Sequence, residues 1–301
     1  MEPKPHKTYR EQVALLVDRG MLIDDEDAAM ALLRRVGYYT LSGYSYPFRF
    51  KDSTGVRTGR FRPGTSLTQV EAIWEFDNRL RAAAFGPLQH VETYLRALLG
   101  YHLGEVNPMI HRKPERLSMD RASDYPLWIA KLDRQVRDSR EEFIVHHREK
   151  RNSIVPIWVA VDVLDWGGLS YLYSFAPLGV RDNVAQAFGL NAAQLKSWVR
   201  ALNVVRNVCA HHSRLYNRYY SLTPKLPRRG LYPALDAIVP VKDSTFAMLT
   251  LLQHLALNTL GANTRLLPSV LRTFPADSGM ELTSMGAPAD WASSSLWRLR
   301  T

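Results

Sequence analysis

The sequence predicts a mainly α-helical protein of 301 residues, with a small unit of helices and a β-hairpin near its N-terminus. Apolar residues recur three and four positions apart over Leu67–Leu103 and again over Leu195–Cys209, as they do on the buried face of an α-helix. Apolar and polar residues alternate instead over Tyr44–Phe50 and Val56–Arg62. This alternation predicts two strands joined by a turn at Lys51–Gly55.

Two short helices are expected before the hairpin. Tyr9–Arg19 carries apolar residues on one face, and Gly20 can end this helix because glycine readily adopts the left-handed conformation. Asp24 or Asp25 can cap a second helix, Glu26–Val36. The apolar face of the second helix is formed by Ala29, Leu32, Leu33 and Val36. The pair resembles a helix-turn-helix unit, although many such pairs do not contact DNA.

The predicted hairpin is basic and contains interleaved aromatic residues, namely Tyr44, Tyr46, Phe48, Phe50 and Phe61. Such a surface can bind single-stranded RNA, because aromatic rings stack on bases and cations hold phosphates. The aromatic residues can instead pack onto the helices, and we favour that interpretation for them. The basic residues stay RNA-binding candidates: Arg49, Lys51, Arg57, Arg60 and Arg62.

A domain boundary is predicted at Pro63-Gly64-Thr65, where the pattern is interrupted. The expected division is an N-terminal unit over residues 1–64, a helical domain over residues 65–275 and a tail over residues 276–301. The tail is rich in Ser, Gly, Ala and Pro but contains Trp291 and Trp297. We therefore expect the tail to dock through these side chains.

The long helix after this boundary has recognisable sequence signals. Ser66 and Gln69 can form a capping box at its start. Gly86-Pro87 should kink it, because proline removes a backbone hydrogen bond and clashes with the preceding turn. Two pairs of opposite charge stand four residues apart, which allows pairing on the helix surface. They are Asp77 with Arg81 and Glu92 with Arg96.

The middle of the chain is predicted to be helical after one irregular segment. Glu105–Tyr125 contains two prolines and no periodicity, so it is expected to be a loop or lid. The predicted helices that follow are Pro126–Lys150, Ile157–Phe175, Val180–Phe188 and, further on, Ser244–Leu260. Gly167-Gly168 is expected to mark either a bend or a close helix crossing in Ile157–Phe175. A connector rich in proline and arginine, Thr223–Pro233, supplies Lys225, Arg228 and Arg229 as further RNA-binding candidates.

The stretch from Leu195 to Arg218 organises the rest of the chain. Asn191 can cap this helix, and its apolar stripe is formed by Leu195, Trp198, Val199, Leu202, Val205 and Cys209. Arg206, Asn207 and His211 lie off the stripe, just before the helix should end. A cation, an amide and an imidazole on one rigid element suit phosphate chemistry. Arginine and histidine at this position can equally well complement the helix dipole.

Composition narrows the classes of partner and site. A net charge of +10 favours a polyanionic partner, nucleic acid first and an acidic membrane surface second. No apolar run approaches the ~20 residues that span a bilayer, and no secretory signal is visible, so we expect a cytoplasmic protein without a membrane partner. Cys209 is the sole cysteine, which excludes an internal disulfide and a multi-cysteine zinc site. We expect neither a cofactor nor a bound metal.

Several blocks, taken together and in order, resemble a known family. The segment Arg206-Asn207-Val208-Cys209-Ala210-His211 looks like the Arg-x4-6-His motif of the HEPN ribonuclease superfamily, and the surrounding RNVCAHHSRLYNR is similar to its Abi-like (AbiD/AbiF-type) abortive-infection branch. Arg19–Phe48, Phe76–Arg81, the helix through Glu92 and Arg96, and Met285-Gly286 with Trp291 resemble the same family.

The resemblance implies an HEPN-like helical bundle and a metal-independent endoribonuclease of phage defence. Histidine can transfer protons near neutral pH, and arginine can bind the transition-state phosphate. One chain supplies one such set, so a two-fold homodimer would be needed to provide both proton-transfer groups. Arg206, Asn207 and His211 would be catalytic, with Asp77, Arg81, Glu92 and His212 in support; His212 is the alternative proton carrier. Arg214 and Arg218 would hold RNA.

The expected partner is RNA, as substrate and, by the same resemblance, as a structured noncoding RNA bound by the protein. Two functions from other classes compete with the nuclease. A non-catalytic RNA-binding module would use the same basic face, with Arg206 and His211 merely binding phosphate. A DNA-binding regulator would use the N-terminal helix pair and hairpin as a winged unit.

Overall fold

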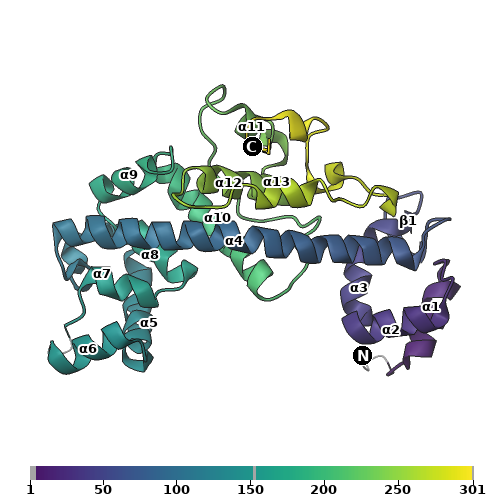
Figure 1. Cartoon of the computed structure of the whole chain (residues 1–301), viewed down its shortest axis with the longest axis horizontal. Helices are drawn as coiled ribbons and strands as arrows, with labels where there is room; N and C mark the ends of the chain where they lie inside the picture. Colours follow the sequence, from purple (N-terminus) through teal and green to yellow (C-terminus); the bar gives the residue numbers. More distant parts are fainter. Residues whose placement is uncertain (1–4, 152–153, 300–301) are drawn as a thin grey trace. The chain divides into compact units, whose positions relative to one another are not determined.

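The computed structural model describes residues 5–151 and 154–299, and the predictions for residues 1–4, 152–153 and 300–301 lie outside this range. The described chain is mainly helical, with one small antiparallel hairpin near the N-terminus, which confirms the predicted fold class (Figure 1). In this described part, no helix is long and apolar enough to cross a membrane.

The chain divides into two compact units. The first consists of the residues up to Leu80 together with Arg272–Leu282, and the second of Arg81–Leu271 together with Thr283 onward. The predicted boundary at Pro63-Gly64-Thr65 stays a prediction.

The first unit begins with α1 (Tyr9–Asp18) and α2 (Glu26–Val36), both at their predicted positions. Thr8 caps α1 in a capping box with Glu11, and Gly20 follows α1 with a φ of 90°. Asp25 is the residue that caps α2, because its side chain accepts a hydrogen bond from the amide of Ala28.

The predicted first strand is wrong over most of its length. Residues 38–45 form helix α3 (Tyr38–Ser45) and residues 46–48 form the 3-10 helix η1 (Tyr46–Phe48); only β1 (Arg49–Lys51) is extended, paired with β2 (Arg57–Phe61). Leu41, Tyr44 and Phe48 are the large side chains buried here, and their spacing of three and four is that of a helix; Ser45 and Pro47 are buried beside them. Alternation of aromatic residues hid this period in the sequence.

The hairpin aromatics divide into two groups. Tyr44, Phe48 and Phe61 are buried, as the packing interpretation predicted. Tyr46 and Phe50 are about half exposed, so that interpretation was wrong for these two.

The long helix α4 (Leu67–Val106) begins at the predicted capping box and continues through Pro87. The Ser66 amide donates to Gln69 Oε1 at 3.0 Å, and the Gln69 amide donates to Ser66 Oγ at 3.2 Å. Asp77 and Arg81 are both buried, so their predicted place on the helix surface was wrong. The Tyr44 hydroxyl donates to Asp77 Oδ2 at 2.6 Å, which ties α3 to the first half of α4.

The second unit begins at Arg81, within α4, and contains the second half of that helix and most of the helices that follow it. After the second half of α4 come η2 (Ile110–Arg112), η3 (Pro114–Arg116), η4 (Met119–Asp124), α5 (Tyr125–Asp138), α6 (Glu142–Lys150), α7 (Ile157–Ala160), η5 (Val161–Val163), α8 (Trp166–Phe175), α9 (Leu178–Gln186) and α10 (Ala192–Ala210). The predicted single helix Pro126–Lys150 is therefore two helices, α5 and α6, and the predicted single helix Ile157–Phe175 is divided into α7 and α8. The break before α8 falls at Leu164-Asp165 rather than at Gly167-Gly168, because Asp165 is extended and caps α8.

The C-terminal part closes the core of the second unit. It comprises α11 (Pro233–Asp236), η6 (Val239–Val241), α12 (Thr245–Leu257) and α13 (Leu266–Leu271), with the short turns η8 (Leu282–Met285) and η9 (Trp291–Ser293) beyond them. The turn η7 (Ala276–Ser278) and Leu282 belong to the first unit. Helix α12 is buried along its length. Trp297 is buried against Phe246 of α12, with ring centroids 5.2 Å apart.

The hydrogen bond between Tyr44 and Asp77 yields a first testable prediction. Tyr44→Phe should lower the free energy of unfolding by about 1–3 kcal/mol, because it removes a partner of a buried polar group. Tyr39→Phe is the matched control, since Tyr39 lies on the same helix with its side chain exposed. Urea denaturation of both variants measures the difference, and equal midpoints would contradict the stabilising role of this bond.

Candidate functional site

Helix α10 holds the candidate site on a firmly packed scaffold. Asn191 caps it in a capping box, with the Asn191 and Gln194 amides each donating to the other residue's side chain at 2.9 Å. All six residues of the predicted apolar stripe are buried. The indole of Trp166, the first residue of α8, donates to the Val199 carbonyl of α10 at 2.7 Å. The stripe thus fixes which residues of α10 face outward.

The C-terminal end of α10 places the two imidazoles. His211 is the C-cap, and His212 follows with a φ of 54°, in the left-handed region that side chains seldom adopt. The amide of Ser213 donates to the Val208 carbonyl at 3.0 Å, and the amide of His212 donates to the Cys209 carbonyl at 3.3 Å. These two bonds define a Schellman motif, in which the chain reverses directly after the helix. Asn207, His211 and His212 are all exposed there.

The chain after the imidazoles is anchored as well. Leu215 and Tyr216 are buried, and the Thr245 hydroxyl at the start of α12 lies 2.8 Å from the Leu215 carbonyl, to which it donates. The same hydroxyl accepts from the amide of Arg218 at 2.9 Å. Tyr216 shares a hydrogen bond of 2.7 Å with Ser284. The exposed imidazoles therefore stand between two fixed points rather than on a free loop.

Arg206, one turn earlier on α10, faces a carboxylate of α4. Its Nε lies 3.8 Å from Glu92 Oε2, a distance of an ion pair without a hydrogen bond. Glu92 is held by Arg96, whose Nη2 donates to Glu92 Oε1 at 2.9 Å. Arg96 in turn donates to the carbonyls of Val161 and Leu164 at 3.1 and 3.0 Å. The predicted Glu92–Arg96 pair is thus confirmed, and it fixes the carboxylate beside Arg206.

The guanidinium of Arg206 keeps most of its binding capacity. Its Nε is buried and lacks a hydrogen-bond partner within the described residues, while the side chain is 29% exposed. A guanidinium offers five N–H donors in a planar fork that matches a phosphate. Glu92 therefore holds the charge in place without using those donors.

A second carboxylate near Arg206, Asp165, was missed from sequence. Its Oδ1 accepts from the Gly168 amide at 2.7 Å, and its Oδ2 accepts from Lys131 Nζ at 2.6 Å. Burial alone raises the pKa of Asp165. The hydrogen bonds from Lys131 and Gly168, with the charges of Lys131 and Arg206, outweigh burial and lower this pKa below its ordinary value of 3.8. The spacing of Asp165 and Gly168, which fits an N-cap, was the available signal.

The other predicted residues fall into separate surroundings. Asp77 accepts from Tyr44 in the first unit, and Arg81 is buried in the second, so their support of the site stays a prediction. On the hairpin, Lys51, Arg60 and Arg62 are exposed. Arg57 is partly engaged in hydrogen bonds within the protein, since its Nη1 donates to the carbonyls of Pro47 and Arg49 at 2.7 and 3.2 Å.

In the second unit, the connector after α10 presents its cations to solvent. Lys225, Arg228 and Arg229 are exposed. The connector is attached to α10, because the indole of Trp198 donates to the Lys225 carbonyl at 2.8 Å and the Lys225 amide donates to Ser197 Oγ at 2.8 Å. Arg214 and Arg218 are half-buried, and Arg218 Nη1 lies 3.5 Å from the Arg214 carbonyl.

These features define a helical protein with an exposed imidazole–amide cluster and a cation held by a neighbouring carboxylate at the end of one core helix. Residues 31–217, more than half of the chain, match the model of the Abi-like protein family, so the chain belongs to that family. Membership implies a role in abortive infection, a defence against phage. Neither the curated proteins nor the solved structures contain a match.

The lowered pKa of Asp165 yields a prediction of pH dependence. A carboxyl whose pKa is lower in the folded than in the unfolded protein stabilises the fold above its unfolded value, and this contribution is lost as the pH falls through the folded value. Asp165→Asn retains an oxygen that can cap α8 but cannot ionise. The stability advantage of the natural protein over this variant should therefore be constant near neutral pH and shrink below 3.8. Urea denaturation across this range measures it, and an advantage independent of pH would contradict the assignment.

Proposed function

We propose that the protein is a metal-independent endoribonuclease of the AbiD/AbiF-type branch of the HEPN superfamily, acting in abortive infection. The observation that carries the proposal is the end of α10. There Asn207 and His211 are exposed beside Arg206, whose guanidinium has an ion-pair neighbour but keeps its donors for another anion. Family membership supports the biological setting but does not by itself supply the reaction.

The proposed reaction uses the nucleophile that RNA itself carries. A base removes the proton of a 2′-hydroxyl, and the oxygen attacks the adjacent phosphorus. The bond from phosphorus to the 5′-oxygen breaks as an acid donates a proton to that oxygen. The products are a 2′,3′-cyclic phosphate and a 5′-hydroxyl. Arg206 stabilises the extra negative charge of the transition state, and Asn207 orients the phosphate or the imidazole.

Two proton-transfer groups are needed, and His211 provides one per chain. We propose that a two-fold homodimer brings both Arg206–His211 pairs into one composite site. The exposed position of His211 at a helix end supports this arrangement, because two such ends can approach each other without unfolding either chain. His212 is the alternative proton carrier.

RNA would reach the site along the exposed cations. Lys225, Arg228 and Arg229 belong to the connector attached to α10, so they are well suited to hold the substrate. Arg214 and Arg218 would contact RNA nearer the imidazoles. The hairpin cations of the first unit would hold RNA as well, including a structured noncoding RNA that restrains the enzyme.

Cleavage in the absence of divalent metal tests the mechanism. Purified protein incubated with total RNA in EDTA should produce 2′,3′-cyclic phosphate and 5′-hydroxyl ends, which mapping of both ends detects. His211→Ala should reduce the rate by about 10²–10⁴-fold, because it removes a general acid–base group. Cleavage that requires a divalent metal would overturn the mechanism.

The neighbouring imidazole is the matched control for this experiment. His212→Gly removes the second ring while retaining the left-handed conformation that the Schellman motif needs. It should leave cleavage intact if His211 carries the proton, and the reverse result would assign that role to His212. Retained RNA binding without cleavage by the natural protein would instead favour the RNA-binding module.

Subunit mixing tests the composite site. An excess of the Arg206→Ala/His211→Ala protein, allowed to exchange with natural subunits, should lower the activity per natural subunit, because mixed dimers contain only one functional pair. The same excess of an unrelated protein is the control. Constant activity per natural subunit would show that each chain acts alone.

A further inference from the structure

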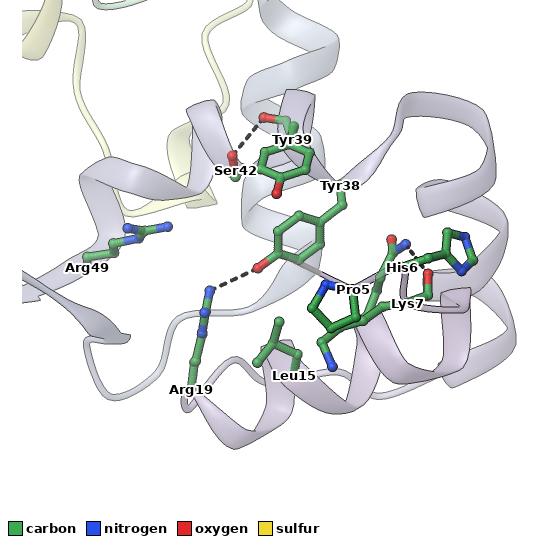
Figure 2. A pocket seen from close by; sticks show the side chains of 10 residues that line it. Pro5, His6, Lys7, Leu15, Arg19, Tyr38, Tyr39, Ser42 and Arg49 are labelled. Carbon is green, nitrogen blue, oxygen red and sulfur yellow. Dashed lines mark hydrogen bonds between the residues drawn. The ribbon is translucent and has the colours of Figure 1, made fainter. Parts of the chain in front are cut away.

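A cavity of about 640 Å³ lies within the first unit, formed by the segment before α1 with α1, α3 and the start of the hairpin. Its size falls in the range of about 300–1,000 Å³ typical of small-molecule sites. Figure 2 shows Arg19 and Arg49 on one side of Tyr38, and Pro5, His6 and Lys7 on the other. Only Arg49 of these residues was expected from sequence to bind RNA.

The wall of the cavity is cationic. Lys7, Arg19 and Arg49 contribute three positive charges, and the described residues that line the cavity include no carboxylate. Within the described chain, no carboxylate oxygen lies within 4.0 Å of a side-chain nitrogen of these three residues. Glu11, on the first turn of α1, accepts hydrogen bonds from the amide and hydroxyl of Thr8 at 2.7 and 2.8 Å, and these bonds, more than the charges of Lys7 and His6, lower its pKa. The cavity therefore favours an anion.

Arg49 adds a second indication of an anion-binding site. Its Nε is buried and has no hydrogen-bond partner among the described residues, and a buried donor without an acceptor is unfavourable. The guanidinium carbon lies 5.3 Å from the ring centroid of Tyr46, so within the described residues this side chain has an aromatic neighbour while its Nε has no acceptor.

Two tyrosines supply flat apolar surface next to these charges. Tyr38 is held by Arg19, whose Nη1 donates to its hydroxyl at 2.9 Å. Tyr39 packs edge-on against Tyr38, with centroids 5.7 Å apart, and is 79% exposed. Its backbone is fixed by a hydrogen bond of 2.7 Å from Ser42 Oγ to the Tyr39 carbonyl. An exposed ring on a fixed backbone is a surface on which a base can stack.

We propose that this cavity binds one unpaired nucleotide, with the base stacked on Tyr39 and the phosphate attracted by Arg19 and Arg49 on one side of Tyr38 and by Lys7 on the other. The combination of aromatic faces and unpaired cations is the one by which proteins hold single-stranded nucleic acid. The same chemistry would accept a free nucleotide or a nucleotide within an RNA chain. The inference that the nucleotide belongs to an RNA chain rests on the proposed function. The inference that the cavity binds a nucleotide does not.

Binding measurements on a protein that cannot cut RNA test the proposal. In the Arg206→Ala/His211→Ala background, Tyr39→Ala should raise the Kd for a labelled, unstructured single-stranded RNA about tenfold, as loss of one stacked base does. Tyr39→Phe, which keeps the ring, should bind as the parent does. Lys7→Gln should reduce the salt dependence of binding by about one phosphate contact. Tyr101→Ala, an exposed tyrosine of α4, is the matched control and should change nothing.

Calorimetry with adenosine monophosphate distinguishes the two sources of the ligand. A Tyr39-dependent loss of affinity for the mononucleotide would assign the cavity to free nucleotides, and a loss seen only with RNA would assign it to a nucleotide in a chain. Unchanged affinity of both Tyr39→Ala and Lys7→Gln for both ligands would overturn the proposal. Because these proteins lack the catalytic pair, failure of RNA cleavage by the natural protein leaves the outcome unaffected.

Discussion

The reversal of the chain at His212 is the constraint on which the candidate site depends. A buried stripe holds α10 against its neighbours, and the Schellman motif then turns the chain within two residues. Without this turn, the helix would carry the imidazoles onward around its axis. With it, Asn207, His211 and His212 share one end of the helix, and the buried Leu215 returns the chain to the core. A left-handed histidine is conformationally costly, by about 1–2 kcal/mol, so the surrounding contacts must hold it.

The carboxylates around Arg206 are the second feature that defines the candidate site. Arg206 is flanked by a carboxylate that is itself fixed by Arg96, and its charge also acts on Asp165. Removing Glu92 or Arg206 would leave the charge of the other residue half-buried without its counter-ion, which is unfavourable. The same two carboxylates neutralise Arg206 only in part, because neither takes up its donors by a short hydrogen bond. The result is a cation that is held in position and still able to bind.

Periodicity and caps made much of this arrangement predictable. The six-residue stripe of α10, the Asn191 cap and the Ser66–Gln69 capping box are local signals, and each predicted the observed element. Asp165 could not be assigned in the same way, since its place near Arg206 depends on how α8 packs on α10. Residues 44–48 were misread because tyrosine and phenylalanine favour strands locally, whereas burial of Tyr44 and Phe48 within the first unit imposed helical structure. The cavity in that unit combines Lys7, Arg19 and Arg49, which no short-range pattern connects.

The bracing of the segment after α10 makes the far end of the chain a determinant of local geometry. Gly286 has a φ of 90°, and a β-carbon there would collide with the Ser244 side chain that caps α12. The next residue of that helix, Thr245, holds the carbonyl of Leu215, and Ser284 holds Tyr216. The segment from Thr283 onward thus supports the surface around the two imidazoles, which lies about 70 residues earlier in the sequence; Tyr216 and Ser284 are 68 residues apart. Substitutions in that segment would therefore shift the imidazoles through the hydroxyl groups of Thr245 and Ser284.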